Sequence, residues 1–265
     1  EFEKTITKYG AVMIDNSSAF RMDPEVPLVV PEVNPQAILK HKGIIANPNC
    51  STIIMVMALK PIYELSRIKR VIVSTYQAVS GAGKEGIDEL DAQVRDHSEG
   101  REMTANILPS ASAEKHYPIA FNLIPQIDVF CDNLYTKEEM KMVNETKKIM
   151  EDYEMRITAT TIRVPVYRSH SESVNIELEK DVDLDVMRAA LAKFPGVTVQ
   201  DDPASQEYPM PLYTSEKDDV YVGRLRRDES CEKSYNIWVV GDQIRKGAAL
   251  NTLQIAETMI KNGWI

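Results

Sequence analysis

The stretch that decides the fold is 43–66, "GIIANPNCSTIIMVMALKPIYELS". Its first five residues read as a buried strand that runs into Pro48, and the residues from Ser51 onward have the length and composition of a helix. Ser51 or its neighbour is expected to supply the N-cap of that helix. The stretch therefore predicts a strand followed by a helix, with Cys50 at the junction.

The position of Cys50 permits two interpretations. A free cysteine usually serves as a small buried hydrophobic residue. At a helix N-terminus, however, the unpaired amides and the helix dipole favour thiolate, so the pKa of Cys50 is expected to fall below the free value of about 8.5. Cys131 and Cys231 lie in "VFCDN" and "ESCEK", which give no such setting, and are interpreted as structural or incidental.

Elements on either side of this stretch continue the alternation. We expect strands at 11–15, 69–79, 157–164, 173–179, 220–226 and 235–240, and helices at 83–97, 136–151, 183–193 and 246–263. Thr136 and Glu139 have the spacing of a capping box, and Gly263 suits a C-cap. Because helices and strands alternate early and strands cluster later, the fold class is α/β, a parallel part joined to a mixed sheet.

Composition narrows the class of protein. The chain has 265 residues, 43% apolar and 27% charged, which is ordinary for a globular protein. A net charge of −9 argues against a nucleic-acid or membrane-surface partner. The apolar run at 52–59 is shorter than the roughly 20 residues that span a bilayer, and the first residues lack the apolar region of a signal peptide. Three widely spaced cysteines cannot all pair, so we expect a cytoplasmic protein.

The string "GAGKEG" at 81–86 matches a dinucleotide fingerprint only in part. That fingerprint also needs an acidic residue about 20 positions on, at the tip of a second buried strand, and "EGREMTANI" at 99–107 is polar. We interpret 81–86 as a turn whose glycines serve backbone shape, with a lesser cofactor contact as the alternative.

Arg163 and His170 are predicted to converge on one polar loop between two strands. A guanidinium suits a carboxylate and an imidazole suits proton transfer, although a solvated turn is the alternative. His116 is a candidate loop contact, and His41 and His97 need no role. No pattern predicts a metal site.

Taken together, several segments resemble aspartate-β-semialdehyde dehydrogenases. They are "DNSSAFR" (15–21), "PLVVPEVN" (27–34), "NPNCST" (47–52), "STYQAVSGAG" (74–83), "RVPVYRSHSESV" (163–174) and "KGAALNTLQIAE" (246–257). The resemblance covers nearly the whole chain. It implies the remainder of a Rossmann-like NADP-binding domain at 1–49, a mixed-sheet α+β catalytic and dimerisation domain at 50–245, and a C-terminal helix at 246–265 that returns to the first domain.

The resemblance also implies a role for each matching residue. Cys50 is the acylated nucleophile, His170 the general acid/base, and Gln77 the residue that orients substrate and intermediate. Arg163 would bind the substrate carboxylate, and Glu139 would bind its amino group. The residues that would contact phosphate are Arg21, Asn49 and Lys141. Those that would contact NADP are Ser80, Gly81 and Asn251. Glu139 can instead be only a capping residue, Lys141 a solvated charge, and Asn251 a helix surface residue.

The implied reaction is the NADP- and phosphate-dependent interconversion of aspartyl phosphate and aspartate β-semialdehyde, in lysine, threonine and methionine biosynthesis, by a homodimer or homotetramer. The alternatives are another acylating aldehyde dehydrogenase, acting on N-acetylglutamyl or glyceraldehyde phosphates, or a catalytically silent dimerisation fragment. Family members open with a glycine-rich turn, G-x-x-G-x-x-G, that this chain lacks. We therefore expect a fragment or an incomplete record, unable to turn over alone.

Overall fold

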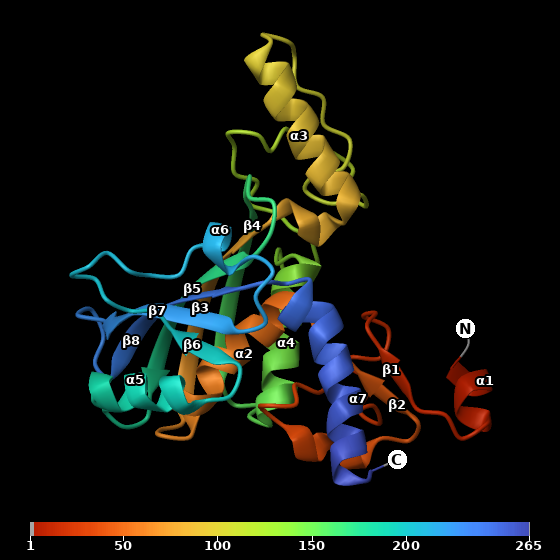
Figure 1. Cartoon of the computed structure of the whole chain (residues 1–265), viewed down its shortest axis with the longest axis vertical. Coiled ribbons are helices and arrows are strands. Elements are labelled where there is room, and N and C mark those ends of the chain that lie inside the picture. Colours follow the sequence, from red (N-terminus) through yellow and green to blue (C-terminus); the bar gives the residue numbers. More distant parts are fainter. Residues whose placement is uncertain (1–2, 265) are drawn as a thin grey trace.

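The computed structural model describes residues 3–264 and is arranged around a six-stranded mixed sheet with a smaller parallel pair beside it (Figure 1). The small pair is β1 (Met13–Asp15) with β2 (Ile44–Ala46). The large sheet has the order β4-β3-β5-β8-β7-β6 and consists of β3 (Ile68–Gln77), β4 (Arg156–Arg163), β5 (His170–Leu178), β6 (Val197–Val199), β7 (Val220–Arg227) and β8 (Ser234–Gly241). The expected parallel part and mixed sheet are thus both present.

The helices surround these sheets. The α-helices are α1 (Glu3–Lys8), α2 (Cys50–Tyr63), α3 (Lys84–Ser98), α4 (Lys137–Met150), α5 (Leu184–Lys193), α6 (Pro211–Thr214) and α7 (Leu250–Asn262). Two short 3₁₀ helices are η1 (Pro35–Lys40) and η2 (Val79–Ala82), and η3 (Arg245–Ala249) is a π-helical turn. None of the helices between residues 3 and 264 has the length and hydropathy that crossing a bilayer requires.

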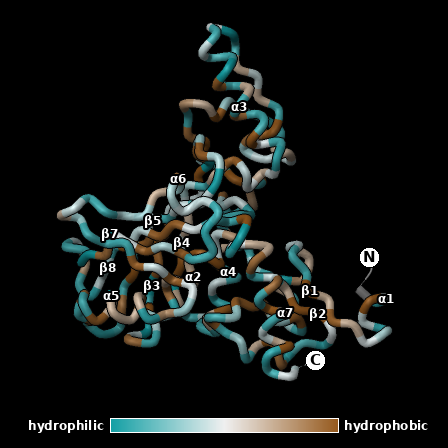
Figure 2. The backbone as a smooth tube through the Cα atoms, viewed as in Figure 1, coloured by the Kyte–Doolittle hydropathy of each residue, from teal (hydrophilic) through white to brown (hydrophobic). Residues whose placement is uncertain are grey.

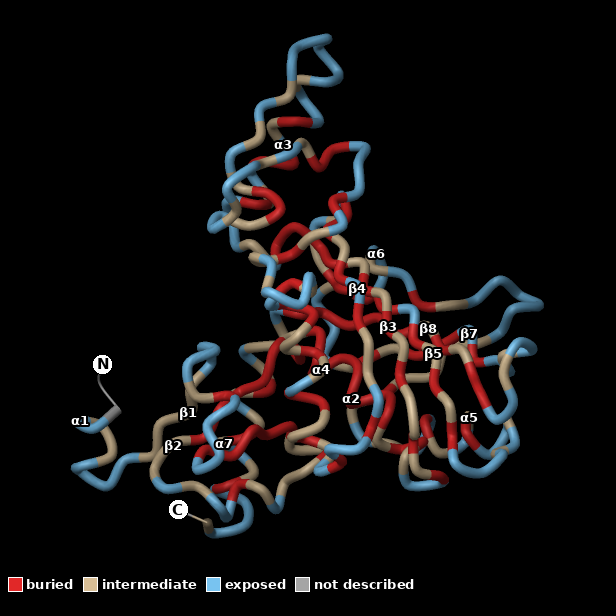
Figure 3. The backbone as a smooth tube through the Cα atoms, turned by 180° about the vertical axis from the view of Figure 1, so that it is seen from behind, coloured by how far each residue is buried: buried red, intermediate tan, exposed pale blue. Residues whose placement is uncertain are grey.

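Helix α2 is the centre of the large core. Its residues from Ile53 to Leu59 are all buried, because the helix is apolar on every side and packs against both the sheet and α4. Asn49, and not Ser51, is the N-cap: its Oδ1 accepts the N–H groups of Ser51 at 3.1 Å and Thr52 at 3.3 Å. Apolar segments gather around α2 in Figure 2, and buried segments gather there in Figure 3.

The start of β5 differs from the sequence prediction. The strand was expected from residue 173, yet it begins at His170, which pairs with Gly241 of β8. The polar sequence "HSES" gives no sign of a strand, because its pairing with β8 is made by backbone groups and does not depend on the side chains. The first residues of this segment are nevertheless buried. His170 is therefore held at the first position of a central strand, and not in a loop.

Helix α3 and the loop after it form an arm that projects from the sheet (Figure 1) and is largely exposed (Figure 3). A small apolar cluster holds the arm together; it includes Val79, Leu90, Leu108, Ile119 and Ile124.

The predicted capping box on α4 is present, with Thr136 and Glu139 bonded reciprocally. The arm follows β3 in the chain, and the start of α4 also lies next to the end of that strand.

The last helix returns to the small parallel sheet. Its α-helical part begins at Leu250, later than the predicted 246, because η3 takes up the preceding turn. Gly263 ends it with φ +65°, as predicted. Ile255 and Met259 pack in one cluster with Val29, Ile38 and Ile45. The C-terminal segment therefore covers the first part of the chain.

Candidate active site

Four predicted residues converge at one edge of the large sheet. Gln77 ends β3 and is in register with Arg163, the last residue of the parallel strand β4. His170 begins β5, which runs antiparallel to β3, so it lies at the same edge. Cys50 begins α2 directly after Asn49, and the side chains of Asn49 and Gln77 both donate to Glu138 Oε1, which joins the start of α2 to the end of β3. The sheet edge thus gathers a thiol, an amide, a guanidinium and an imidazole.

His170 is fully buried, and both ring nitrogens have neighbours. The backbone N–H of Ala78 donates to Nδ1 at 3.1 Å, and Nε2 of Gln77 lies 3.4 Å from Nε2 of the ring. Burial, and then the charge of Arg163, hold the pKa of His170 well below its usual range. The ring is therefore neutral near pH 7.

Arg163 is a buried cation with a relative exposure of only 2%. Its Nη1 donates to the carbonyl of Ala78 at 2.8 Å and its Nη2 to that of Pro109 at 3.4 Å, while Nε is buried without a partner. No carboxylate within residues 3–264 forms an ion pair with it. Burial accordingly lowers the pKa of Arg163. Such an unpaired guanidinium suits an anionic substrate group.

Cys50 is half-buried, and the expected fall in its pKa is wrong. Burial, followed by the charge of Glu138, raises the pKa of Cys50 to about 12; contacts with Ser51 and the charge of Arg21 oppose the rise. The helix N-terminus is thus outweighed by loss of solvent. The group is a thiol near neutral pH and must lose its proton as it reacts.

Glu138, the residue before the predicted Glu139, contacts two of the candidate site residues. Both oxygens of Glu139 accept backbone N–H groups, from Thr136 at 2.7 Å and from Thr161 at 3.0 Å, so the capping interpretation holds for that residue. Glu138 Oε1 accepts from Asn49 Nδ2 at 3.0 Å and from Gln77 Nε2 at 3.2 Å. Consecutive residues in the first turn of a helix point in different directions, so Glu138 and Glu139 have different contacts although they are adjacent in sequence.

The residues expected at phosphate are Asn49 and two cations that pair with the carboxylates bonded to it. Arg21 donates from Nη1 to Glu145 at 3.2 Å, and Glu145 also accepts the backbone N–H of Asn49 at 2.7 Å. Lys141 is paired with Asp128 at 3.0 Å and with Glu138 at 3.1 Å. Lys141 is thus a member of a charge network and not a solvated helix charge.

The residues expected at the cofactor divide into two groups. Ser80 and Gly81 lie in η2, beside the site: a Cβ at Gly81 would meet Arg163 Nη1 at 2.8 Å and His170 Cε1 at 3.3 Å. Asn251 is fully buried, and its amide is engaged by Val29 and Asn47. The η2 segment therefore packs against Arg163 and His170, whereas both polar atoms of the Asn251 side chain are bonded within the protein.

The glycines of 81–86 meet backbone requirements, as the sequence interpretation proposed. Gly83 has φ +85°, and a Cβ at Gly86 would lie 2.5 Å from the carbonyl oxygen of Val79. Gly81 packs closely against Arg163. Close packing or backbone conformation therefore explains each of the three glycines in 81–86.

Two polar residues of the site escaped sequence reasoning. Gln243 donates to Ser80 Oγ at 2.6 Å and accepts the N–H of Ser169 at 3.0 Å, so it joins η2 to the residue before His170. Glu172 is fully buried, neither carboxylate oxygen has a partner among the described residues, and burial raises its pKa well above the usual range. The alternation of β5 was the available signal, since it places Glu172 on the face of His170.

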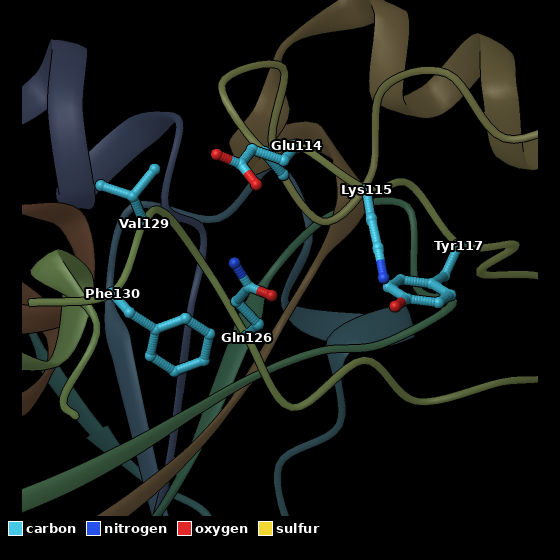
Figure 4. Close-up of a pocket in the computed structure, with 7 residues that line it drawn as sticks. Glu114, Lys115, Tyr117, Gln126, Val129 and Phe130 are labelled. Atoms are coloured by element: carbon cyan, nitrogen blue, oxygen red, sulfur yellow. The ribbon is translucent and has the colours of Figure 1, made fainter.

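Other features lie outside this constellation. A hollow of about 380 Å³ is lined by Ala113, Glu114, Lys115, Tyr117, Gln126, Val129 and Phe130 (Figure 4). Its residues come from the loops after α3 and include none of the candidate site residues. No group of three or more His, Cys, Asp or Glu side chains in the part of the chain that is described is placed to hold a metal ion.

Comparison with known families agrees with this geometry. The profile described as the semialdehyde dehydrogenase dimerisation domain matches residues 59–246, and the one described as the semialdehyde dehydrogenase NAD binding domain matches residues 1–41. Nicotinamide-cofactor binding and oligomerisation therefore belong to the architecture of the family.

Relatives and solved structures agree with the profiles. The chain is 54% identical to aspartate-semialdehyde dehydrogenase of Aquifex aeolicus, over 100% of this chain and 77% of the relative, and 53% identical to that of Bacillus subtilis, over 96% and 74%. The crystal structure of aspartate semialdehyde dehydrogenase II from Vibrio cholerae complexed with ASA is 45% identical, with a TM-score of 0.92 over 98% of this chain and 76% of that one. The structure with NADP from Candida albicans is 25% identical, with a TM-score of 0.74 over 100% and 75%. The chain belongs to the aspartate-semialdehyde dehydrogenase family.

Proposed function

We propose that this enzyme interconverts aspartyl phosphate and aspartate β-semialdehyde through a thioester on Cys50, with NADP as cofactor. The observation that carries the proposal is the meeting of Cys50, neutral His170 and the unpaired guanidinium of Arg163 at one sheet edge. These groups meet the needs of an acyl-transfer reaction on a carboxylate-bearing substrate. The named relatives support aspartate as the acyl group.

Two charged residues would bind the substrate. Arg163 has no carboxylate partner, its Nε–H is without an acceptor among the described residues, and its planar guanidinium suits the α-carboxylate. We assign the amino group to Glu138 in place of Glu139, because Glu138 faces Asn49 and Gln77. A carboxylate and a guanidinium on opposite sides would select an amino acid over a simple aldehyde.

Cys50 would act as the nucleophile. Its sulfur forms a bond to the aldehyde carbon, and the thiol proton passes to the carbonyl oxygen, giving a thiohemiacetal. His170 would serve as acid/base for that oxygen: its Nε2–H gives its proton to the oxygen as sulfur adds and takes up the proton of the thiol. Gln77, whose amide lies 3.4 Å from the ring, would orient the substrate. As the thioester forms, the carbon gives up a hydride and the oxygen gives up its proton through His170 to solvent; a nicotinamide group held beside Ser80 and Gly81 would supply the hydride acceptor in this direction and the hydride donor in the other.

Phosphate would then release the acyl group. Its oxygen attacks the thioester carbon, the carbon–sulfur bond breaks, and the sulfur leaves with the proton given up by the phosphate, which restores the Cys50 thiol as aspartyl phosphate forms. Arg21 is the strongest candidate to hold phosphate because its buried Nε has no partner among the described residues. Asn49 and Lys141 lie beside the same network and would assist.

The rest of the proposal concerns the setting. Ser80 and Gly81 would contact the nicotinamide part of NADP, and Asn251 would act only through the packing of α7. We place the nucleotide-binding part at 1–49, the catalytic and dimerisation part at 50–245, and the returning helix at 246–265. The working form would be a homodimer or homotetramer in the cytoplasm, which agrees with three free cysteines.

A substrate-profile assay tests the proposal. In a form of the enzyme that carries the family's glycine-rich turn, NADP reduction is followed with inorganic phosphate and, in turn, aspartate semialdehyde, N-acetylglutamate semialdehyde and glyceraldehyde 3-phosphate. We expect the specificity constant for aspartate semialdehyde to exceed the others by at least about a hundredfold, because the latter two cannot satisfy Arg163 and Glu138 together. A preference for either competitor, or turnover without phosphate, would overturn it.

A further inference from the structure

Helix α4 presents two carboxylates to the N-terminus of α2. Glu138 and Glu145 are seven residues apart, so they lie on one helix face with the buried Met142 and Ile149. Their relative exposures are 5% and 1%. A charge at a core position is costly unless it is paired, so the partners of each carboxylate indicate its purpose.

Both carboxylates hold Asn49, the residue before Cys50. Glu138 accepts from its side-chain amide at 3.0 Å, and Glu145 Oε2 accepts from its backbone N–H at 2.7 Å. Oδ1 of Asn49 meanwhile caps the first turn of α2. Helix α4 therefore fixes the start of the helix that carries the nucleophile.

The other oxygen of Glu145 binds Arg21 at 3.2 Å, a residue 124 positions away. Nη2 of Arg21 donates to the carbonyl of Asn16 at 3.2 Å, so both terminal nitrogens are held while Nε stays without a partner in the described chain. Glu145 also accepts the backbone N–H of Asn49, the residue directly before Cys50. One carboxylate thus joins the loop of Arg21 to the helix of Cys50.

We infer that Glu145 is a positioning residue for phosphate, which keeps the guanidinium of Arg21 and the thiol of Cys50 in one relative placement. The inference rests on the proposed function in taking inorganic phosphate as the anion that Arg21 binds. An ion pair that only stabilised the fold would leave phosphate binding unchanged once a folded variant is compared with the wild type.

Protection of Cys50 against alkylation tests the inference without requiring turnover. The chain is treated with iodoacetamide at increasing concentrations of inorganic phosphate, and peptide mapping by mass spectrometry follows Cys50 alone. Each rate is divided by the rate without phosphate. In Glu145→Gln, one of the two donors must face an amide NH₂ instead of an oxygen, so half-protection should need on the order of tenfold more phosphate.

The matched control is Glu151→Gln, which removes an ion pair with Lys40 in which the side chains are 64% and 68% exposed. It should leave half-protection unchanged. If Glu145→Gln does not fold by circular dichroism, Glu145→Asp replaces it, because the shorter side chain cannot reach Arg21 and Asn49 together; the same shift is expected.

Three outcomes separate the possibilities. Equal half-protection in folded Glu145→Gln and wild type overturns the role of Glu145. In an Arg21→Lys background, Glu145→Gln should add little, since it acts through Arg21; fully additive effects also overturn the role. Absence of any protection in the wild type would instead remove the phosphate site, and with it that part of the proposed function.

Discussion

The backbone N–H of Ala78 points at Nδ1 of His170 across 3.1 Å. Nδ1 therefore accepts, and the neutral ring carries its proton on Nε2. Nε2 lies 3.4 Å from the amide nitrogen of Gln77, which is also a donor, so no hydrogen bond joins them and the Nε2 proton is left for a substrate oxygen. The carbonyl of the same Ala78 accepts from Arg163. The backbone N–H and C=O of one residue, Ala78, thus set the tautomer of the imidazole and the placement of the guanidinium.

This tautomer predicts a difference between two substitutions. The amide nitrogen of His170→Gln reaches the place of Nε2, whereas that of His170→Asn reaches only the place of Nδ1. The asparagine variant should lose about 10²–10⁴-fold in kcat, and the glutamine variant should keep roughly tenfold more activity. ¹⁵N NMR of the wild-type ring should find the proton on Nε2 at pH 7; a proton on Nδ1 contradicts the assignment.

Replacement of each cysteine should identify the nucleophile. Cys50→Ala should abolish phosphate-dependent NADP reduction, because no other thiol lies at the sheet edge, and should leave the circular dichroism spectrum intact. Cys131→Ala and Cys231→Ala, at partly exposed positions, are the controls and should be nearly silent. Comparable losses in a control variant would transfer the role to that thiol.

The raised pKa of Cys50 predicts how a neighbouring charge controls its reactivity. The negative charge of Glu138 contributes to the raised pKa of Cys50. Glu138→Gln should therefore lower that pKa and increase the thiolate fraction, so alkylation of Cys50 at pH 8 should accelerate. Glu139→Gln is the matched control, one residue along; it weakens the capping box and should leave the rate unchanged. Equal acceleration in both variants would refute the choice of Glu138.

Arg163→Lys should be a poor enzyme although it keeps the charge. A lysine cannot copy the planar fork, and loss of one charge-assisted pair costs about 1.5–3 kcal/mol, or roughly ten- to a hundredfold in kcat/KM for aspartate semialdehyde. Arg156→Lys, at an exposed position on the same strand, should behave as wild type. Unchanged kinetics in Arg163→Lys would move the substrate carboxylate elsewhere.

Because Glu172 is buried, we expect the free energy of unfolding to fall as pH rises. Its folded pKa lies above the unfolded value of about 4.3, so folding retains the proton that the unfolded chain releases, and stability declines from about pH 4.3 toward the folded pKa. Glu172→Gln should remove this decline and raise Tm at pH 8 while matching the wild type near pH 4.

Thermal unfolding at both pH values checks the prediction, with about 2–4 °C expected per kcal/mol at this chain length. Glu177 on the same strand is the control: its pKa is lowered, chiefly by Lys69, so Glu177→Gln should lose stability at neutral pH and converge with the wild type in acid. A Tm of Glu172→Gln at or below wild type at pH 8 would contradict the account.

Local patterns predicted much of this fold. The apolar composition of 52–59 is sufficient to identify a buried helix, and Thr136 with Glu139 fixes the start of α4 without tertiary information. The convergence of Cys50 and Arg163 came from family resemblance, because no local pattern brings together residues so far apart in sequence.

The remaining features depend on burial and on contacts between distant segments. The pKa of Cys50 is set by the solvent that α2 loses and by Glu138, and neither appears in the sequence around the thiol. Asn251 looks like a helix surface residue until α7 is placed on Val29. Glu138 was recoverable in principle, since a charged residue at helical spacing with Met142 lies in an apolar stripe.

The return of α7 to the small sheet bears on how the chain is made. A ribosome synthesises the β1–β2 pair well before α7, and a small sheet is only marginally stable without a cover. That cover, Ile255 and Met259, follows some two hundred residues later in the chain. The first part of the chain must therefore wait, incompletely packed, through the translation of some two hundred residues, and in the cell it is the natural place for a chaperone to bind.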